Sequence, residues 1–135
     1  MKSQLMGLVA VAAVAVSGIA YAGAMWTSDI YIIKNANGSG SMSGTLGSVR
    51  NSSSTTSQLG CYYENFPPSW GSYKYASCAG YDGTKWGSCG TTDPAITDTI
   101  SRLQGDSYLW VEFDASGNCT RVQIGSQSTA PPKSL

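Results

Sequence analysis

Four cysteines constrain the fold of this chain more than any other feature of its sequence: Cys61, Cys78, Cys89 and Cys119. An even number of cysteines in a small exported domain is typical of a disulfide framework. No two of them form a CxxC pair and the chain contains no histidine, so a zinc site would lack both its usual spacing and its commonest ligand. We therefore expect two structural disulfides, no metal and no other cofactor. Three pairings are possible, and the turn-like segments between successive cysteines leave the choice open.

The N-terminus has the pattern of a secretory signal peptide. Lys2 supplies a positive charge, residues 5–19 are apolar, and Ala20-Tyr21-Ala22 has the small residues of a cleavage site. Residues 1–22 are therefore predicted to be removed. The product is expected to be secreted or periplasmic.

An uncleaved membrane anchor is the alternative, because low polarity continues almost to Trp26. Ser17 interrupts the apolar stretch, and no positive cluster follows it to orient an anchor. These two features favour cleavage. We expect no membrane contact once the signal peptide has been removed.

The length of the chain, 135 residues, leaves room for one domain. We expect a single β-rich domain over residues 23–125 and a flexible tail over residues 126–135, which carry little apolar surface. The formal net charge of the whole chain is zero, and losing Lys2 changes it by one unit. Such a balance provides no electrostatic attraction to nucleic acid, so none is expected as a partner.

Short runs of β-branched and aromatic residues predict a mainly β fold, either a small antiparallel sheet or a β-sandwich with one short helix. Strands are predicted at residues 29–34, 45–49, 73–81, 107–113 and 119–124. Residues 35–44 have the chemistry of a turn, and residues 114–118 are expected to join the last two strands as a hairpin. In that hairpin, Leu109, Val111 and Phe113 share the face that should point to the core.

The one predicted helix begins after Asp93-Pro94. Asp93 can accept hydrogen bonds at the N-cap, and Pro94 suits the first helical position. Ile96, Ile100 and Leu103 then repeat at helical spacing before Gly105. A helix this short must lean on the sheet to persist.

Several short motifs lie between Leu46 and Ile124: Gly47-Ser48-Val49-Arg50-Asn51-Ser52, Gly60-Cys61, Asp93-Pro94, Gly105-Asp106-Ser107-Tyr108 and Phe113-Asp114-Ala115-Ser116-Gly117-Asn118-Cys119-Thr120. They resemble a family of small, uncharacterised, secreted bacterial proteins that carry a signal peptide and four cysteines. The resemblance implies a bacterial source. It implies no activity, ligand or catalytic residue.

The first candidate site is the outward face of the strand at residues 107–113. Tyr108, Trp110 and Glu112 share this face, so a sugar ring can stack on Trp110 and hydrogen-bond to Glu112. With Asp114 the spacing also allows a hydrolase pair, although nothing in the sequence argues that one carboxyl is kept protonated. The alternative is a sheet covered on both faces, with Tyr108 and Trp110 in the core.

The second candidate is a set of aromatic residues in the middle of the chain. Trp70 and Trp86 lie in turn-like segments. Together with Tyr62, Tyr63, Tyr73 and Tyr75 they can form a platform on which a sugar stacks. The alternative is that the two tryptophans pack as lids over a small core.

Nucleophilic catalysis has little support, because the chain has no histidine base and no Gly-x-Ser-x-Gly elbow. The sequence therefore predicts a secreted, non-catalytic binding or surface protein whose partner is a glycan or another cell-envelope component. A small secreted hydrolase is one alternative. A structural envelope protein that self-associates through its sheet edges is another.

Overall fold

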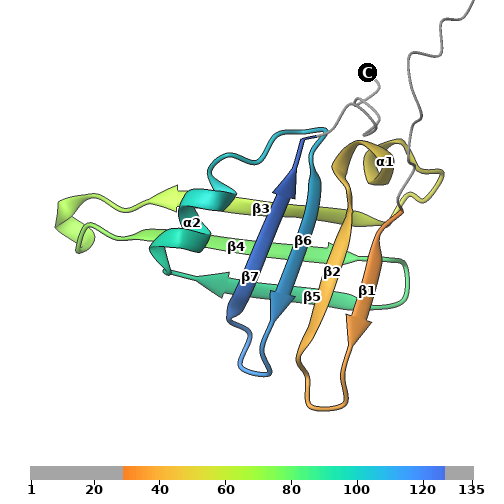
Figure 1. Ribbon diagram of the computed structural model, residues 1–135, viewed down its shortest axis with the longest axis horizontal. Helices are drawn as coiled ribbons and strands as arrows, with labels where there is room; N and C mark the ends of the chain where they lie inside the picture. Colours follow the sequence, from red (N-terminus) through yellow and green to blue (C-terminus); the bar gives the residue numbers. More distant parts are fainter. Residues whose placement is uncertain (1–28, 127–135) are drawn as a thin grey trace, which may run out of the picture.

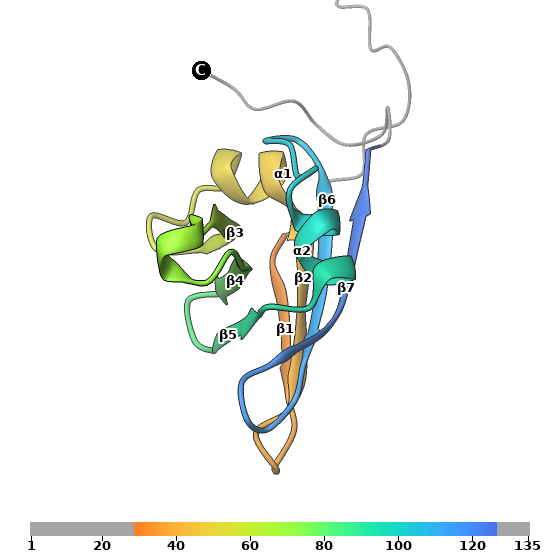
Figure 2. The same ribbon diagram turned by 90° about the vertical axis from the view of Figure 1, so that its left-hand side faces the viewer.

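The computed structural model describes residues 29–126, which form two antiparallel sheets packed face to face. The strands are β1 (Tyr31–Lys34), β2 (Gly40–Thr45), β3 (Gln58–Asn65), β4 (Lys74–Tyr81), β5 (Trp86–Thr91), β6 (Tyr108–Phe113) and β7 (Cys119–Gly125). The four-stranded sheet has the order β1-β2-β6-β7, and the three-stranded sheet has the order β3-β4-β5. Figure 1 shows the strands of one sheet running across those of the other, and Figure 2 shows the two layers edge-on. The predicted mainly β, antiparallel fold is confirmed.

The core lies between the two sheets and follows from alternation along the strands. On β6, Leu109 and Val111 are fully buried and Phe113 nearly so, as the alternation predicted. They pack with Ile32 and Met42 of the same sheet. The three-stranded sheet contributes small residues, among them Ala76, Cys78 and Cys89. Each sheet therefore has one buried face and one outer face.

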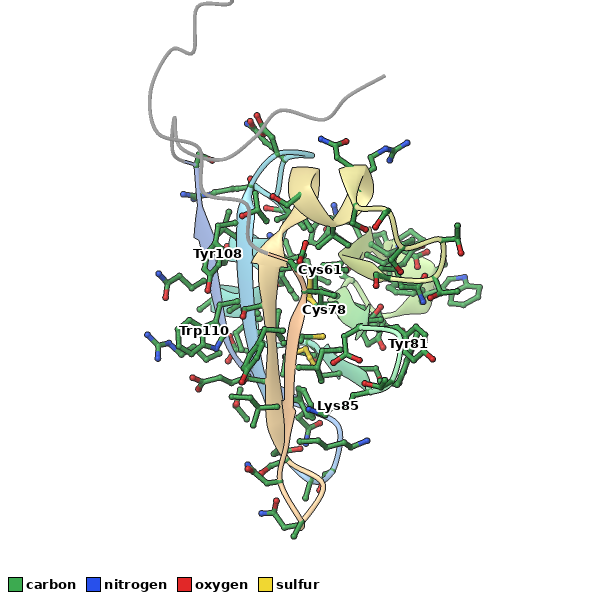
Figure 3. The ribbon with its side chains drawn as sticks, turned by 90° about the vertical axis from the view of Figure 1, so that its right-hand side faces the viewer. Cys61, Cys78, Tyr81, Lys85, Tyr108 and Trp110 are labelled. Carbon is green, nitrogen blue, oxygen red and sulfur yellow. A yellow bond between two sulfur atoms is a disulfide. The ribbon has the colours of Figure 1, made fainter. Side chains whose placement is uncertain are left out.

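Both expected disulfides form. Cys61 and Cys78 join the neighbouring strands β3 and β4, whereas Cys89 and Cys119 join β5 of one sheet to β7 of the other. Beside the second bond, the Gly90 N–H donates to the Gly117 carbonyl at 2.9 Å. Figure 3 shows Cys61 and Cys78 between the two layers. All four cysteines are thus used to hold the sandwich together.

The predicted helix is present as α2 (Pro94–Ile100). The Asp93 carboxylate accepts from the backbone N–H groups of Ala95 and Ile96, at 2.9 and 3.0 Å. Ile100 is buried, and α2 packs against β7 and β4 at one side of the sandwich. The helix ends at Ile100, and Leu103 lies in the turn that follows.

The predicted strand at residues 45–49 is wrong, because Leu46–Asn51 forms the short helix α1. Leu46 packs against the core, and Val49 is buried. Residues three apart point to opposite faces of a strand but to one face of a helix, so only the helix buries both.

The predicted turn at residues 35–44 is too long. Asn35–Ser39 makes the turn, and β2 begins at Gly40 and lies between β1 and β6. Its glycines and serines have weak strand propensity. Pairing on both sides makes this segment a strand nonetheless.

The predicted signal peptide at residues 1–22 and the predicted tail beyond Ser126 lie outside the described residues. Within residues 29–126 no helix is long and apolar enough to cross a membrane.

Candidate functional site

The residues predicted to bind a ligand lie at three separate places on the surface. Tyr108, Trp110 and Glu112 are on the outer face of the four-stranded sheet, Trp86 is on the outer face of the three-stranded sheet, and Trp70 is at the tip of the β3–β4 hairpin. Tyr81 lies opposite Trp86 on the neighbouring strand, and in Figure 3 Trp110 and Tyr81 point away from the molecule on opposite sides. The predicted residues therefore do not form one site.

On the four-stranded sheet, Trp110 is exposed and Tyr108 is half-buried, so the alternative that both residues belong to the core is wrong. The Arg121 guanidinium carbon lies 5.8 Å from the centre of the Trp110 ring. Arg121 also pairs with the Glu112 carboxylate at 3.6 Å. Arg121 thus lies beside both groups that were predicted to meet a sugar.

Asp114, the other carboxylate considered for catalysis, holds the β6–β7 turn. It accepts from the Asn118 side-chain amide and from the backbone N–H groups of Ser116 and Asn118, each at 2.9 Å. The Asn118 side chain first, and then the backbone donors, hold the pKa of Asp114 below its ordinary value. Such a carboxylate stays ionised, which is the opposite of what a general acid requires.

The tip of the β3–β4 hairpin carries a stacked aromatic cluster. Phe66 and Tyr73 stack with ring centres 4.5 Å apart, and Trp70, at the end of the short 3-10 turn Pro68–Trp70, lies 5.9 Å from Phe66. Trp70 is 68% exposed. It does not pack as a lid over the core.

The outer face of the three-stranded sheet has small side chains across its middle and aromatic ones at its margins. Gly60, Ala79 and Ser88 form one row across the strands, and Ser77 with Gly90 belongs to the next. A shallow depression of about 410 Å³ lies over this floor, and its lining includes Gln58, Gly60, Tyr62, Ser77, Ala79 and Trp86. We call these six residues the platform.

Two of the platform residues, Tyr62 and Trp86, carry exposed rings at its margins. The Tyr62 hydroxyl donates to Glu64 Oε2 at 2.9 Å, and this hydrogen bond, together with the negative charge of Glu64, raises the pKa of Tyr62. Trp86 is 45% exposed and lies 6.0 Å from Tyr81, with the two rings tilted by 44°. The platform thus presents polar groups and exposed aromatic rings side by side.

Gly60 differs from the other glycines within the strands of the three-stranded sheet. A Cβ added to Gly80 would lie 3.0 Å from Ile30, and one added to Gly90 would overlap the Tyr75 hydroxyl, so packing explains both. A Cβ added to Gly60 would meet nothing within 4 Å, and its φ lies outside the left-handed region. Glycine weakens a strand, and inside one it often marks the close approach of a ligand. Packing and backbone conformation leave Gly60 unexplained.

Sequence reasoning placed Tyr62, Trp86 and Tyr75 in this region but missed the small floor. Alternation over residues 73–81 already put Tyr75 and Ser77 on one face, and β4 confirms it. Tyr63, which was predicted to join the aromatic platform, instead faces inward and packs against the core. The pairing of β3 with β4, which brings Gly60 beside Ala79, has no local signal.

Within residues 29–126, no three histidine, cysteine, aspartate or glutamate side chains are grouped as metal ligands. Comparison of the chain with protein-family models, with curated proteins and with solved structures found no match in any of the three. The resemblance to small secreted bacterial proteins therefore stays a prediction.

Proposed function

We propose that this protein is an exported, non-catalytic glycan-binding protein, and that it binds a glycan on the platform of the three-stranded sheet. The observation that carries this proposal is the floor around Gly60, which is open and built of small residues, between the exposed rings of Tyr62 and Trp86.

A sugar ring is apolar on its faces and polar at its rim. Aromatic side chains can cover the apolar face, while nearby polar groups bind the hydroxyls. Tyr62 and Trp86 supply the rings, and Gln58 and Ser77 supply polar groups beside them. The small floor lets a ligand approach the sheet backbone closely.

The two disulfides support export, because such bonds persist in oxidising compartments such as the periplasm or the extracellular space. The predicted signal peptide agrees with this location.

The rival functions have less support. Glu112 pairs with Arg121, and Asp114 holds a turn, so neither carboxylate is arranged for hydrolysis. Self-association would use open sheet edges, but Lys85 Nζ donates to the Ile32 carbonyl of the edge strand β1 at 3.2 Å. Lys85 belongs to the turn between β4 and β5, and its ammonium group brings a positive charge to this edge. Charged lysines at a sheet edge disfavour edge-to-edge pairing.

The test is a glycan array probed with the exported protein purified with its disulfides intact. Trp86→Ala should weaken binding about tenfold or more by removing the stacking surface, and Gly60→Val should do so by filling the floor. Trp110→Ala is the matched control, because it removes the same side chain from the opposite outer face. Circular dichroism should show all three variants folded. The absence of any bound glycan, or binding that survives both Trp86→Ala and Gly60→Val, would overturn the proposal.

A further inference from the structure

The aromatic tip of the β3–β4 hairpin lies on the same face of the hairpin as the platform. Side chains two residues apart in a strand point to the same face. Phe66 therefore shares the face of Tyr62 and Glu64, and Tyr73 shares the face of Tyr75. The Phe66 N–H donates to the Tyr73 carbonyl at 2.8 Å, which extends the strand pairing one step beyond β3 and β4. Figure 1 shows this hairpin projecting beyond the four-stranded sheet.

The tip is held in one shape by its backbone as well as by its stacked rings. Gly71 and Ser72 both have positive φ, of 101° and 52°. Ser72 is the one non-glycine residue with positive φ in the described part of the chain. A non-glycine residue in this region is uncommon, and residues held so are frequent at ligand-binding sites. Ser72 lies between the two most exposed rings of the tip, Trp70 and Tyr73.

The charges around the tip favour a sugar over a lipid surface. No charged residue lies between Glu64 and Lys74, and Lys74 is paired with Asp98 of α2 at 2.6 Å. Elements that lie on membranes usually combine exposed aromatic residues with several unpaired basic ones. The described part of the hairpin tip has the rings without the basic residues.

The distance along the hairpin suits a polymer. At roughly 3.3 Å per residue, the stretch from Tyr73, just before β4, to Tyr81 at its end spans about 26 Å. Along it the outward positions carry rings at Tyr73 and Tyr75 near the tip, then the small side chains of Ser77 and Ala79 on the platform, and a ring again at Tyr81. Among the described outward positions of β3, β4 and β5, Glu64 is the one charged residue, which disfavours an acidic polymer.

We infer that the hairpin tip, formed by Phe66, Trp70 and Tyr73, is a second subsite, and that the ligand is a neutral, linear polysaccharide lying along the hairpin from the platform to the tip. This inference rests on the proposed function of the platform. A disaccharide fills the platform alone, whereas a longer oligosaccharide reaches both subsites.

The test compares disaccharides and hexasaccharides of neutral linear glucans, xylan and chitin by titration calorimetry. For the series that binds, the hexasaccharide should bind about tenfold more tightly than the disaccharide. Trp70→Ala should remove this gain and leave disaccharide binding unchanged. Trp86→Ala should weaken binding of both, and Trp110→Ala should weaken neither. Trp70 is exposed, so Trp70→Ala should leave the fold intact.

If the hexasaccharide binds no better than the disaccharide, or if the gain survives Trp70→Ala, the second subsite is overturned while the platform stands. If none of the sugars binds, the proposed function fails as well. Sedimentation with phosphatidylcholine vesicles that depends on Trp70 would make the tip a membrane contact and overturn the inference in a different way.

Discussion

Cys89 on β5 bonds to Cys119 on β7, although Cys78 lies directly opposite Cys89 on the neighbouring strand. Cys78 also lies opposite Cys61, with which it forms the other disulfide. The pairing therefore places one bond within the three-stranded sheet and one between the two sheets.

Removing either disulfide should destabilise the protein, and removing the bond between the sheets should do so more. The bonded cysteines are 30 residues apart in Cys89–Cys119 and 17 apart in Cys61–Cys78. Chain entropy gives about 3 kcal/mol for the shorter loop and about 0.5 kcal/mol more for the longer. Urea unfolding of the two double alanine variants measures both. Equal stability of the wild type and Cys89→Ala/Cys119→Ala would contradict this expectation.

Val111→Asp should unfold the protein. Val111 is fully buried in the middle of the sandwich, and an unpaired carboxylate there costs several kcal/mol against a total stability of about 5–15 kcal/mol. Ile33→Asp is the control, since Ile33 belongs to the same sheet and is exposed. Circular dichroism should show a folded control and an unfolded Val111 variant. A folded Val111→Asp protein would place this residue outside the core.

Gly60→Ala and Gly80→Ala should change stability in opposite directions. A methyl group at Gly60 has open space, so removing the flexible glycine should raise stability by about 0.5 kcal/mol. A methyl group at Gly80 meets Ile30, Leu59 and Met42 at 3.0 to 3.2 Å, and crowding should cost about 1–3 kcal/mol. Thermal unfolding measures both. If Gly60→Ala is destabilising, Gly60 has a structural role, and the presence of glycine at this position no longer indicates a ligand.

Asp114 should stabilise the β6–β7 hairpin in a pH-dependent way. Its pKa is lower in the folded protein than the ordinary value of 3.8. Its contribution is therefore fully present above pH 3.8 and is lost as the pH falls through the lower, folded pKa. The wild type should melt at a higher temperature than Asp114→Ala at neutral pH, and this difference should shrink as the pH falls through the folded pKa of Asp114.

Asn118→Ala provides a separate check, because it removes the largest cause of the low pKa of Asp114. In that variant, the pKa of Asp114 measured by NMR should rise toward its ordinary value. An unchanged pKa would show that the backbone donors of the turn are sufficient.

The amino-acid sequence by itself determined the elements whose signals are local. Alternating residues in β4 and β6 and the N-cap at Asp93 act over a few positions, so they predict strands and a helix without knowledge of the fold. The even number of cysteines likewise indicated two disulfides.

Tertiary structure decided the other elements, because the interactions that form them join distant segments of the chain. Partners on both sides made a strand of the glycine-rich β2, burial of Leu46 and Val49 made a helix of α1, and the β3–β4 register placed Gly60 beside Ala79. Strand pairing also distributed the exposed aromatic rings over two opposite faces and a hairpin tip, which no pattern along the chain can specify.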